Sequence, residues 1–320
     1  MKKIPFFVLS IFLCLFCLVL ILRPDRYLLS ALSALKLWAL AVLPSLLPFF
    51  FLTLMLTKLG TIAKFSNLFS PATKLLYRTD GISAFVQIMS FISGYPVGAR
   101  LICELKSENA IDEITATKMS VFCSTSGPLF IAGSVGVAML SSKQAGIILL
   151  SAHIMSAVFN GIVFRFYGDN RPIAPLLQKS PPKNLLADCA YSASVSCLTV
   201  GTLICVFYVL SDVLADFKIL YPLETLLTFA FNDKQKAAAF SAGLIECTKG
   251  CKMLSETSGF LRLPLISAVI AFGGISVIAQ SLAFLKSAGV KIRIFLLGKL
   301  TQAIFAFLLC AALCLIFKIY

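Results

Sequence analysis

The sequence is poor in charged residues and has a single histidine. Only 13% of its 320 residues are Asp, Glu, Lys or Arg, against roughly 25% in an ordinary soluble domain, whereas 59% are hydrophobic. No water-soluble fold could bury that much apolar surface. With His153 as the one histidine, the chain has no helical His-Glu-x-x-His motif, and most of its eleven cysteines stand alone in apolar segments. We therefore expect neither a metal nor a cofactor, and nothing positively indicates an enzyme.

The sequence instead contains several long apolar runs. A helix needs about 20 apolar residues to cross the hydrocarbon core of a membrane. The runs lack the polar–apolar alternation of barrel strands, which predicts an all-α polytopic membrane protein of the plasma membrane. Met1-Lys2-Lys3 resembles the start of a signal peptide, but no small-residue cleavage site precedes Arg23, so we expect an uncleaved first helix. The clearest spans are 4–22, 28–57, 145–164, 185–211 and 294–317.

The net charge of +14 invites a nucleic-acid interpretation, but the basic residues gather in connections between apolar runs. Cytoplasmic loops of membrane proteins carry such an excess of Lys and Arg. We therefore expect the lipid bilayer, and no nucleic acid, as the partner, and we place two connections inside. One holds Lys58, Lys64, Lys74 and Arg78, and the other holds Arg165, Arg171, Lys179 and Lys183.

A weak internal repeat divides the chain. Similar residues recur in the same order, as the pairs Phe50 and Phe207, Gly98 and Gly250, Ser124 and Ser276, and Ala157 and Ala303 show. Chance similarity between apolar segments is the alternative. The repeat predicts an N-terminal helix and short loop at 1–27, a first half at 28–167, a linker at 168–184 and a second half at 185–320.

Charge placement predicts that the two halves are inverted. Helix 28–57 ends at one basic connection, whereas helix 185–211 begins at the other, so the two cross the membrane in opposite directions. Inversion requires that one element in each half enters and leaves on the same side. We expect these re-entrant elements at 82–105, broken at 94–98, and at 236–256, broken at 248–250. Inverted halves with broken helices are a recurrent plan of transporters.

Two interrupted segments in the first half are candidate binding elements. Ser93, Gly94, Tyr95, Pro96 and Gly98 interrupt an apolar stretch, and proline frees a backbone carbonyl that is tolerated in a membrane only inside protein or at a cavity. A binding-site hairpin tip is one interpretation, and a simple kink or a close glycine contact is the other. The second segment carries three hydroxyls, which either bind a solute or bond to freed carbonyls, at Ser124, Thr125, Ser126 and Gly127.

The second half carries the most suggestive single residue, Glu246. It follows the apolar run 237–245, and an ionisable group near the midplane is costly and by default a functional hypothesis. The alternative is an ion pair with Lys249 or Lys252. We assign no role to His153 or to Lys299, which could snorkel to the surface. The other candidates in this half are Thr248, Gly250, Gly273, Gly274, Ser276 and Gln280, for which helix packing is the alternative.

These motifs resemble a known family, the sporulation integral membrane proteins of the YlbJ type within the nucleoside-recognition (Gate) domain superfamily. The resemblance rests on residues 91–100, 124–131, 243–250 and 272–277 with Gln280, and covers roughly residues 28 to 318. It implies two Gate-type halves, as in concentrative nucleoside transporters, and a role in endospore formation, in building the spore cortex. It does not imply that the cargo is a nucleoside.

The leading hypothesis is a transporter-like protein for an unidentified small polar or ionic solute, with a coupling cation or proton as a further partner. The alternative is a non-transporting membrane scaffold of a sporulation or envelope complex, which need not preserve a polar cavity. An enzyme acting on lipid-linked envelope precursors is a weaker third hypothesis, because no acid–base pair is evident. A homo-oligomer is left open.

Overall fold

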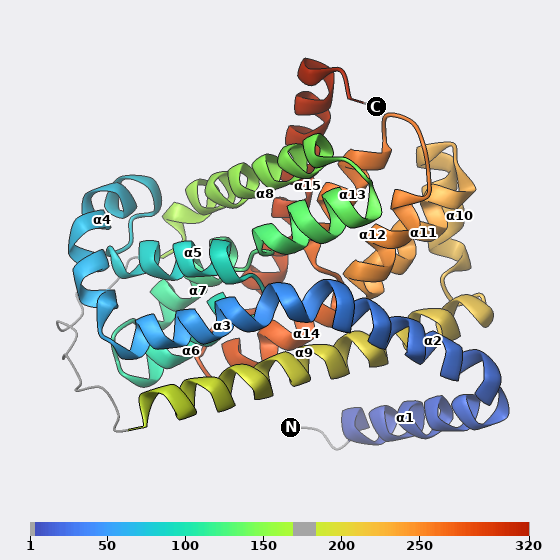
Figure 1. Cartoon of the computed structure of the whole chain (residues 1–320), viewed down its shortest axis with the longest axis horizontal. Coiled ribbons are helices and arrows are strands. Elements are labelled where there is room, and N and C mark those ends of the chain that lie inside the picture. The colour runs from blue at the N-terminus through green and yellow to red at the C-terminus, as the bar shows by residue number, and fades with distance from the viewer. Residues whose placement is uncertain (1–3, 169–183, 320) are drawn as a thin grey trace.

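The computed structural model describes residues 4–168 and 184–319, and every element in this part of the chain is a helix (Figure 1). Four helical segments are long and apolar enough to cross a membrane, and a bent pair at the N-terminus brings a fifth. The chain is therefore an integral membrane protein, as its composition predicts. The four segments are Lys143–Phe166, Leu185–Asp216, Arg262–Leu285 and Ile292–Phe317.

The N-terminal region is helical where the apolar runs predict it, but it is bent. Helix α1 (Ile4–Leu22) meets α2 (Pro24–Leu37) at an angle of 105°. The predicted span 28–57 continues from α2 through a π-helical turn, η1 (Trp38–Val42), into α3 (Leu43–Lys58). It is not one regular helix, because Pro44 lies in the first turn of α3 and Pro48 inside it.

The same order of elements occurs twice along the chain. A long helix is followed by a short peripheral helix, a hairpin of two short helices, a broken helix and a closing helix. After α2 and α3, the first half contains α4 (Thr61–Tyr77), α5 (Ile82–Ser93), α6 (Val97–Ser107), α7 (Glu113–Phe122), η2 (Leu129–Met139) and α8 (Lys143–Val163), which ends in η3 (Phe164–Phe166). The second half contains α9 (Leu185–Asp216), α10 (Tyr221–Phe231), α11 (Lys234–Ile245), α12 (Cys247–Ser255), α13 (Arg262–Phe272), α14 (Gly274–Leu285) and α15 (Ile292–Phe317).

Four breaks interrupt the described helices, and two of them lie in the interrupted segments of the first half that the sequence predicts. The first separates α5 from α6, the second covers 123–128 between α7 and η2, and the third lies at Gly273 between α13 and α14. The fourth differs from the prediction. It lies at Glu246 instead of 248–250, because Glu246 has an extended backbone and its own carboxylate caps α12, which begins at Cys247. Thr248 and Gly250 are therefore helical.

Glycines let the breaks pack directly against one another. A Cβ on Gly94 would lie 2.6 Å from the nitrogen of Gly127, so the two breaks of the first half touch through their backbones. In the second half, a Cβ on Gly274 would lie 2.9 Å from the carbonyl oxygen of Gly243 and 3.1 Å from the nitrogen of Cys247. Side chains at these positions would separate the breaks.

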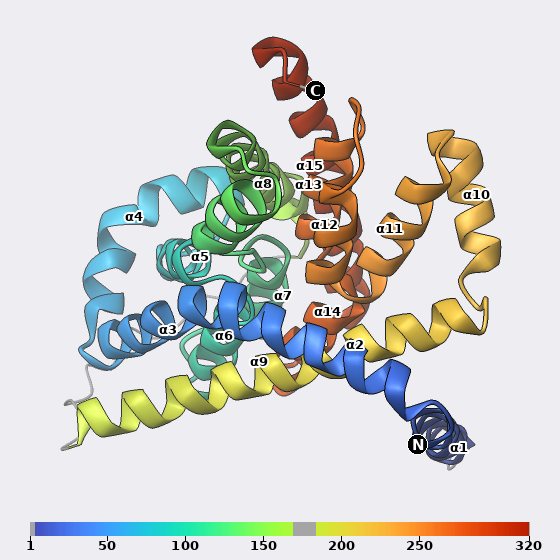
Figure 2. The same ribbon diagram turned by 45° about the vertical axis from the view of Figure 1, so that its right-hand side comes forward.

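The two halves share one core. In the second half α15 packs against α13, and it also packs against α8 of the first half, as Figure 2 shows near the top of the molecule. Helix α9 runs beneath both halves and contacts α2, α3 and α14. Of the predicted linker 168–184, residues 169–183 lie outside the described residues.

Candidate functional site

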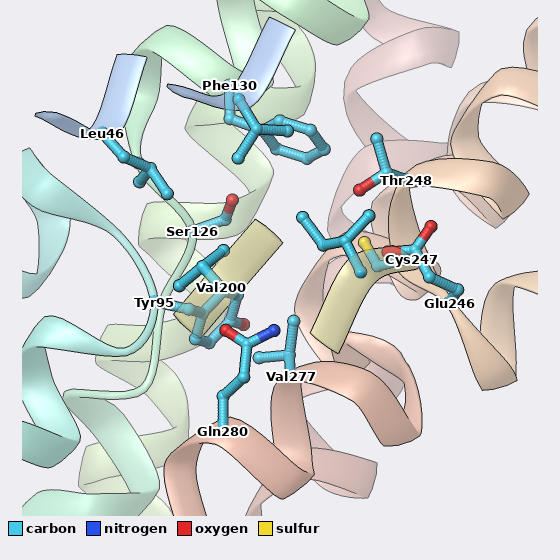
Figure 3. A pocket seen from close by; sticks show the side chains of 13 residues that line it. Leu46, Tyr95, Ser126, Phe130, Val200, Glu246, Cys247, Thr248, Val277 and Gln280 are labelled. Atoms are coloured by element: carbon cyan, nitrogen blue, oxygen red, sulfur yellow. The ribbon is translucent and has the colours of Figure 1, made fainter. Parts of the chain in front are cut away.

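A cavity of about 50 Å³ lies where the breaks of the two halves meet (Figure 3). That volume is several times the room that one water molecule needs. The first half lines it with Val42, Leu46, Tyr95, Ser126, Gly127 and Phe130. The second half lines it with Val200, Ile204, Glu246, Cys247, Thr248, Val277 and Gln280.

Six of the sixteen candidate residues reach this cavity. They come from three breaks, from α12 and from α14, and the side chain of Gln280 extends between Tyr95 and Val277. Ser276 stands behind Gln280, whose Nε2 lies 3.4 Å from its hydroxyl. The six are Tyr95, Ser126, Gly127, Glu246, Thr248 and Gln280. The structure thus brings together groups that are far apart in sequence, and it does so between the halves.

Two other polar candidates, Ser93 and Thr125, serve helix packing, whereas the buried hydroxyl of Ser124 has no hydrogen-bond partner among the described residues. Ser93 shares a hydrogen bond of 2.5 Å with Thr53 on α3, and Thr125 donates to Ser90 on α5 at 3.1 Å. Ser90 in turn donates to the carbonyl of Cys123. For Ser93 and Thr125 the packing interpretation therefore holds. Pro96 lines a neighbouring groove instead of the cavity.

The remaining glycine candidates permit close backbone contacts. A Cβ on Gly98 would lie 1.8 Å from the carbonyl oxygen of Cys123, so α6 and the end of α7 touch. A Cβ on Gly250 would lie 2.2 Å from the Cα of Gly243, which brings α12 against α11. Gly273 turns the chain with a φ of 83°. These residues shape the walls of the site without facing the cavity.

Glu246 supplies the one formally charged side chain among the described residues that line the cavity. Its residue is only 1% exposed, and its carboxylate accepts the backbone N–H of Lys249 at 2.6 Å. The predicted alternative, an ion pair with Lys249 or Lys252, is wrong. The ammonium of Lys249 lies 2.6 Å from Asp212, and that of Lys252 lies 3.0 Å from Glu256. The carboxylate of Glu246 contacts Lys249 through the backbone N–H and not through the ammonium.

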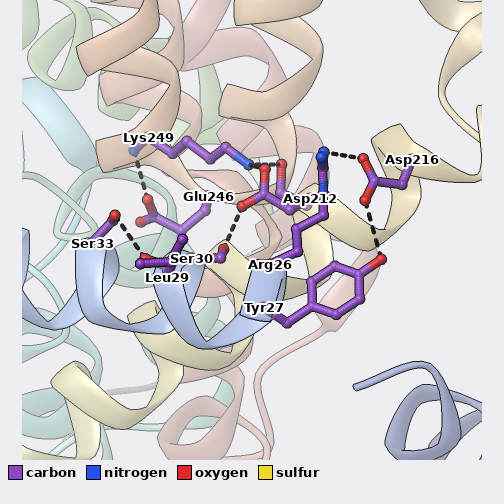
Figure 4. A network of polar contacts seen from close by, with 10 residues as sticks. Arg26, Tyr27, Leu29, Ser30, Ser33, Asp212, Asp216, Glu246 and Lys249 are labelled. Carbon is purple, nitrogen blue, oxygen red and sulfur yellow. Dashed lines mark hydrogen bonds and ion pairs between the residues drawn. The ribbon is translucent and has the colours of Figure 1, made fainter. Parts of the chain in front are cut away.

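Behind Glu246, a polar network joins three helices (Figure 4). Lys249 of α12 pairs with Asp212 of α9 and lies 3.2 Å from the hydroxyl of Ser211. Ser30 of α2 donates to the other oxygen of Asp212. One helical turn further along α9, Asp216 accepts from Tyr27 at 3.1 Å and from Arg26. The network ties α2, α9 and α12 together.

Two buried residues to which the sequence assigned no role contact the break at 123–128. Lys299 on α15 is fully buried and does not snorkel, and its ammonium donates to the hydroxyl of Tyr95 at 2.7 Å and to the carbonyl of Ser124 at 3.1 Å. The Nε2 of His153 on α8 accepts the N–H of Ser126 at 2.9 Å. The signal in the sequence that could have indicated them is their matching position in the closing helices of the two halves.

Comparison with known proteins supplies a family context for this geometry. Residues 39–163 match the family model described as Gate: Nucleoside recognition. The chain is also 28% identical to the sporulation integral membrane protein YlbJ of Bacillus subtilis, over 96% of this chain and 82% of that protein. The resemblance to YlbJ is confirmed. No solved structure matches the chain.

The likeness to YlbJ spans both walls of the cavity, whereas the Gate match spans one. Tyr95, Ser126 and Phe130 lie within the Gate segment, and Glu246 and Gln280 lie beyond it. Neither description names an enzyme.

Proposed function

We propose that this protein is a permease-like membrane protein that passes a small polar or ionic solute, with Glu246 as the group that coordinates the solute or a coupling cation or proton. The observation that carries the proposal is the convergence of broken segments from both halves on one cavity with a buried carboxylate. Unwound backbone and half-helix ends at a midplane site are how many secondary transporters hold their cargo.

The arrangement of the hairpins supports inverted halves with boundaries near 28–167 and 185–320. In Figure 1 the hairpin α5–α6 lies on the left of the molecule and α11–α12 on the right, while residues from both hairpin breaks line the cavity. Hairpins that approach one site from opposite sides are expected of inverted repeats. The Gate match over 39–163 favours a plan like that of the concentrative nucleoside transporters.

A shared cavity also favours transport over the scaffold hypothesis. A scaffold has no need to keep a cavity with a carboxylate in its wall, and burying Glu246 without an ion-pair partner in the described chain is costly. Because the relative from Bacillus subtilis is a sporulation integral membrane protein, we place the activity in endospore formation and in the plasma membrane. Construction of the spore cortex is the step we propose.

The test is a screen of the purified protein for thermal stabilisation by small solutes and cations. A ligand that binds only the folded state raises the free energy of unfolding, by about 2.7 kcal/mol at a concentration of 100 times Kd, and the apparent melting temperature rises with it. We expect at least one small solute or cation to stabilise the wild type and to lose that effect in Glu246→Gln. Ser93→Ala is the matched control, since Ser93 lies outside the cavity. A broad panel without any stabilising compound would favour the scaffold.

A further inference from the structure

A second hollow adjoins the cavity on one side. It has a volume of about 320 Å³ and lies between α6, α9 and α14. Two side chains, Val200 of α9 and Gln280 of α14, line both this groove and the cavity. These two side chains therefore form a partition, with the groove on one side and Glu246 and Cys247 on the other.

The groove runs along α9 towards the breaks. Along α9 its lining extends from Tyr191, which is 74% exposed, to Leu203, a rise of about 18 Å. Arg100 of α6 stands in its wall, bonded to Ser196 at 2.7 Å and paired with Glu104 at 3.1 Å. Glu104 offsets part of the charge of Arg100, which is the one charged residue among the described residues that line the groove.

The opposite end of α9 is closed by the polar network. Asp212 lies about 12 Å along the helix from Ile204, which lines the cavity, and it holds Lys249 of α12 and Ser30 of α2 (Figure 4). Helices α2, α9 and α12 are therefore drawn together on this side, whereas α6, α9 and α14 leave a groove on the other.

We propose that the groove between α6, α9 and α14 is the route by which solutes reach the cavity, with Val200 and Gln280 as its partition, and that it admits small cations in preference to anions. The preference follows from Glu246, which is the charged lining residue at the inner end. The cationic cargo deepens the proposed function and rests on it, but the route can be tested without a known solute.

A native reporter stands at the inner end of this route. Cys247 lines the cavity next to Glu246, and Cys251, one turn further along α12, is fully buried and does not line it. Small methanethiosulfonates report access to a thiol. The thiolate attacks the sulfenyl sulfur, a mixed disulfide forms and methanesulfinate leaves, so no further oxidant is needed. Peptide mass spectrometry of the purified full chain gives the rate at each cysteine.

Two threonines on α9 provide a matched pair of blocking variants. Thr199 lines the groove and Thr202 does not, and both are exposed, each with its hydroxyl bonded at 2.9 Å to the carbonyl four residues earlier. With neutral methyl methanethiosulfonate, we expect Cys247 to react faster than Cys251 in the wild type. Thr199→Trp should slow the reaction of Cys247 about tenfold, and Thr202→Trp should leave it unchanged. Gln280→Ala, which thins the partition, should accelerate it.

The charge preference is tested with two reagents of similar length. Relative to the rate ratio of the two reagents with a free small thiol, Glu246 should favour the 2-aminoethyl over the 2-sulfonatoethyl reagent at Cys247 about tenfold, and Glu246→Gln should remove that excess. Equal rates at Cys247 in Thr199→Trp and Thr202→Trp would overturn the route, as would a Cys247 no faster than Cys251. A charge ratio unaffected by Glu246→Gln would overturn the cation preference alone. None of these outcomes depends on whether the thermal screen finds a solute, so the two proposals fail separately.

Discussion

The ammonium nitrogen of Lys299 lies 2.7 Å from the hydroxyl oxygen of Tyr95, although 204 residues separate the two along the chain. The ammonium also lies 4.5 Å from the centre of the Tyr95 ring. The hydroxyl of Tyr95 lies 3.3 Å from the carbonyl oxygens of Ile270 and Ala271 at the end of α13. Tyr95, in the break between α5 and α6, therefore links α15, through Lys299, to the end of α13.

Replacing Lys299 by methionine should raise thermal stability. No carboxylate pairs with Lys299 in the part of the chain that the structure describes, and burying an ion costs several kcal/mol. Lys299→Met removes the donor to the carbonyl of Ser124 and to the hydroxyl of Tyr95, a loss of about 1–3 kcal/mol, so we expect a net gain of about 1–3 kcal/mol. Thermal unfolding in detergent measures it.

Lys299→Ala is the control for packing. It removes the same charge but leaves a void, which costs about 2–5 kcal/mol, so its melting temperature should fall below that of Lys299→Met. A melting temperature of Lys299→Met below that of the wild type would contradict the prediction and make the ammonium a net structural tie.

Local signals in the sequence located most of the helices and breaks. Apolar length and the Gly and Pro positions fix where a helix spans and where it stops, and Tyr95, Ser126, Gly127 and Gln280 duly face the cavity. These signals act over a few residues, so they predict the positions of helices and breaks without knowledge of the tertiary contacts.

Tertiary partners explain what the sequence did not show. The break at Glu246 was misplaced because a long side chain caps the helix that follows it. An ion pair of Lys249 with Glu246, three residues away, was the alternative that helical spacing offered, whereas its ammonium pairs with Asp212 on another helix. The burial of Lys299 depends on Tyr95 and Ser124, which lie far away in the sequence. Helical spacing cannot indicate such contacts.

Stability measurements can separate the capping hydrogen bond of Glu246 from its charge. Glu246→Gln keeps an oxygen that can accept the N–H of Lys249, so we expect stability within about 1 kcal/mol of the wild type. Glu246→Ala removes the cap of α12 and should cost about 1–2 kcal/mol. Melting temperatures of the two variants, measured side by side, test this. Equal losses in both variants would mean that the charge, and not the cap, stabilises this break.

Gly94 should tolerate no side chain. Its φ of 79° and ψ of −170° lie in a region essentially confined to glycine, and a Cβ would lie 2.6 Å from the nitrogen of Gly127. Strain and overpacking together should make Gly94→Ala cost at least about 2 kcal/mol. Gly60 is the matched control, because it also has a positive φ but no atom within 4 Å of its Cβ position.

Gly60→Ala should therefore cost only the left-handed strain of about 1–2 kcal/mol. Folded yield and melting temperature measure both variants. A Gly94→Ala protein as stable as Gly60→Ala would mean that the two breaks of the first half do not touch.

The ion pair between Lys249 and Asp212 should contribute far more to stability than the ion pair between Lys252 and Glu256. The side chains of Lys249 and Asp212 are 8% and 26% exposed, whereas those of Lys252 and Glu256 are 51% and 57% exposed. Asp212→Ala leaves an ammonium almost buried without its carboxylate, which we expect to cost about 3 kcal/mol. Glu256→Ala should cost at most about 1 kcal/mol, because water screens an exposed pair.

A double-mutant cycle isolates the pairwise energy from these losses. Lys249→Met combined with Asp212→Ala should recover part of the stability lost in Asp212→Ala, because no unpaired charge then remains buried. The same cycle at Lys252 and Glu256 should give a coupling energy near zero. If Asp212→Ala instead proves as mild as Glu256→Ala, the network of α2, α9 and α12 does not hold that side of the cavity closed. In that case, removing Asp212 would open no second path to the cavity. The rate at which Cys247 is modified would then be the same in the Thr199→Trp, Asp212→Ala double variant as in Thr199→Trp alone.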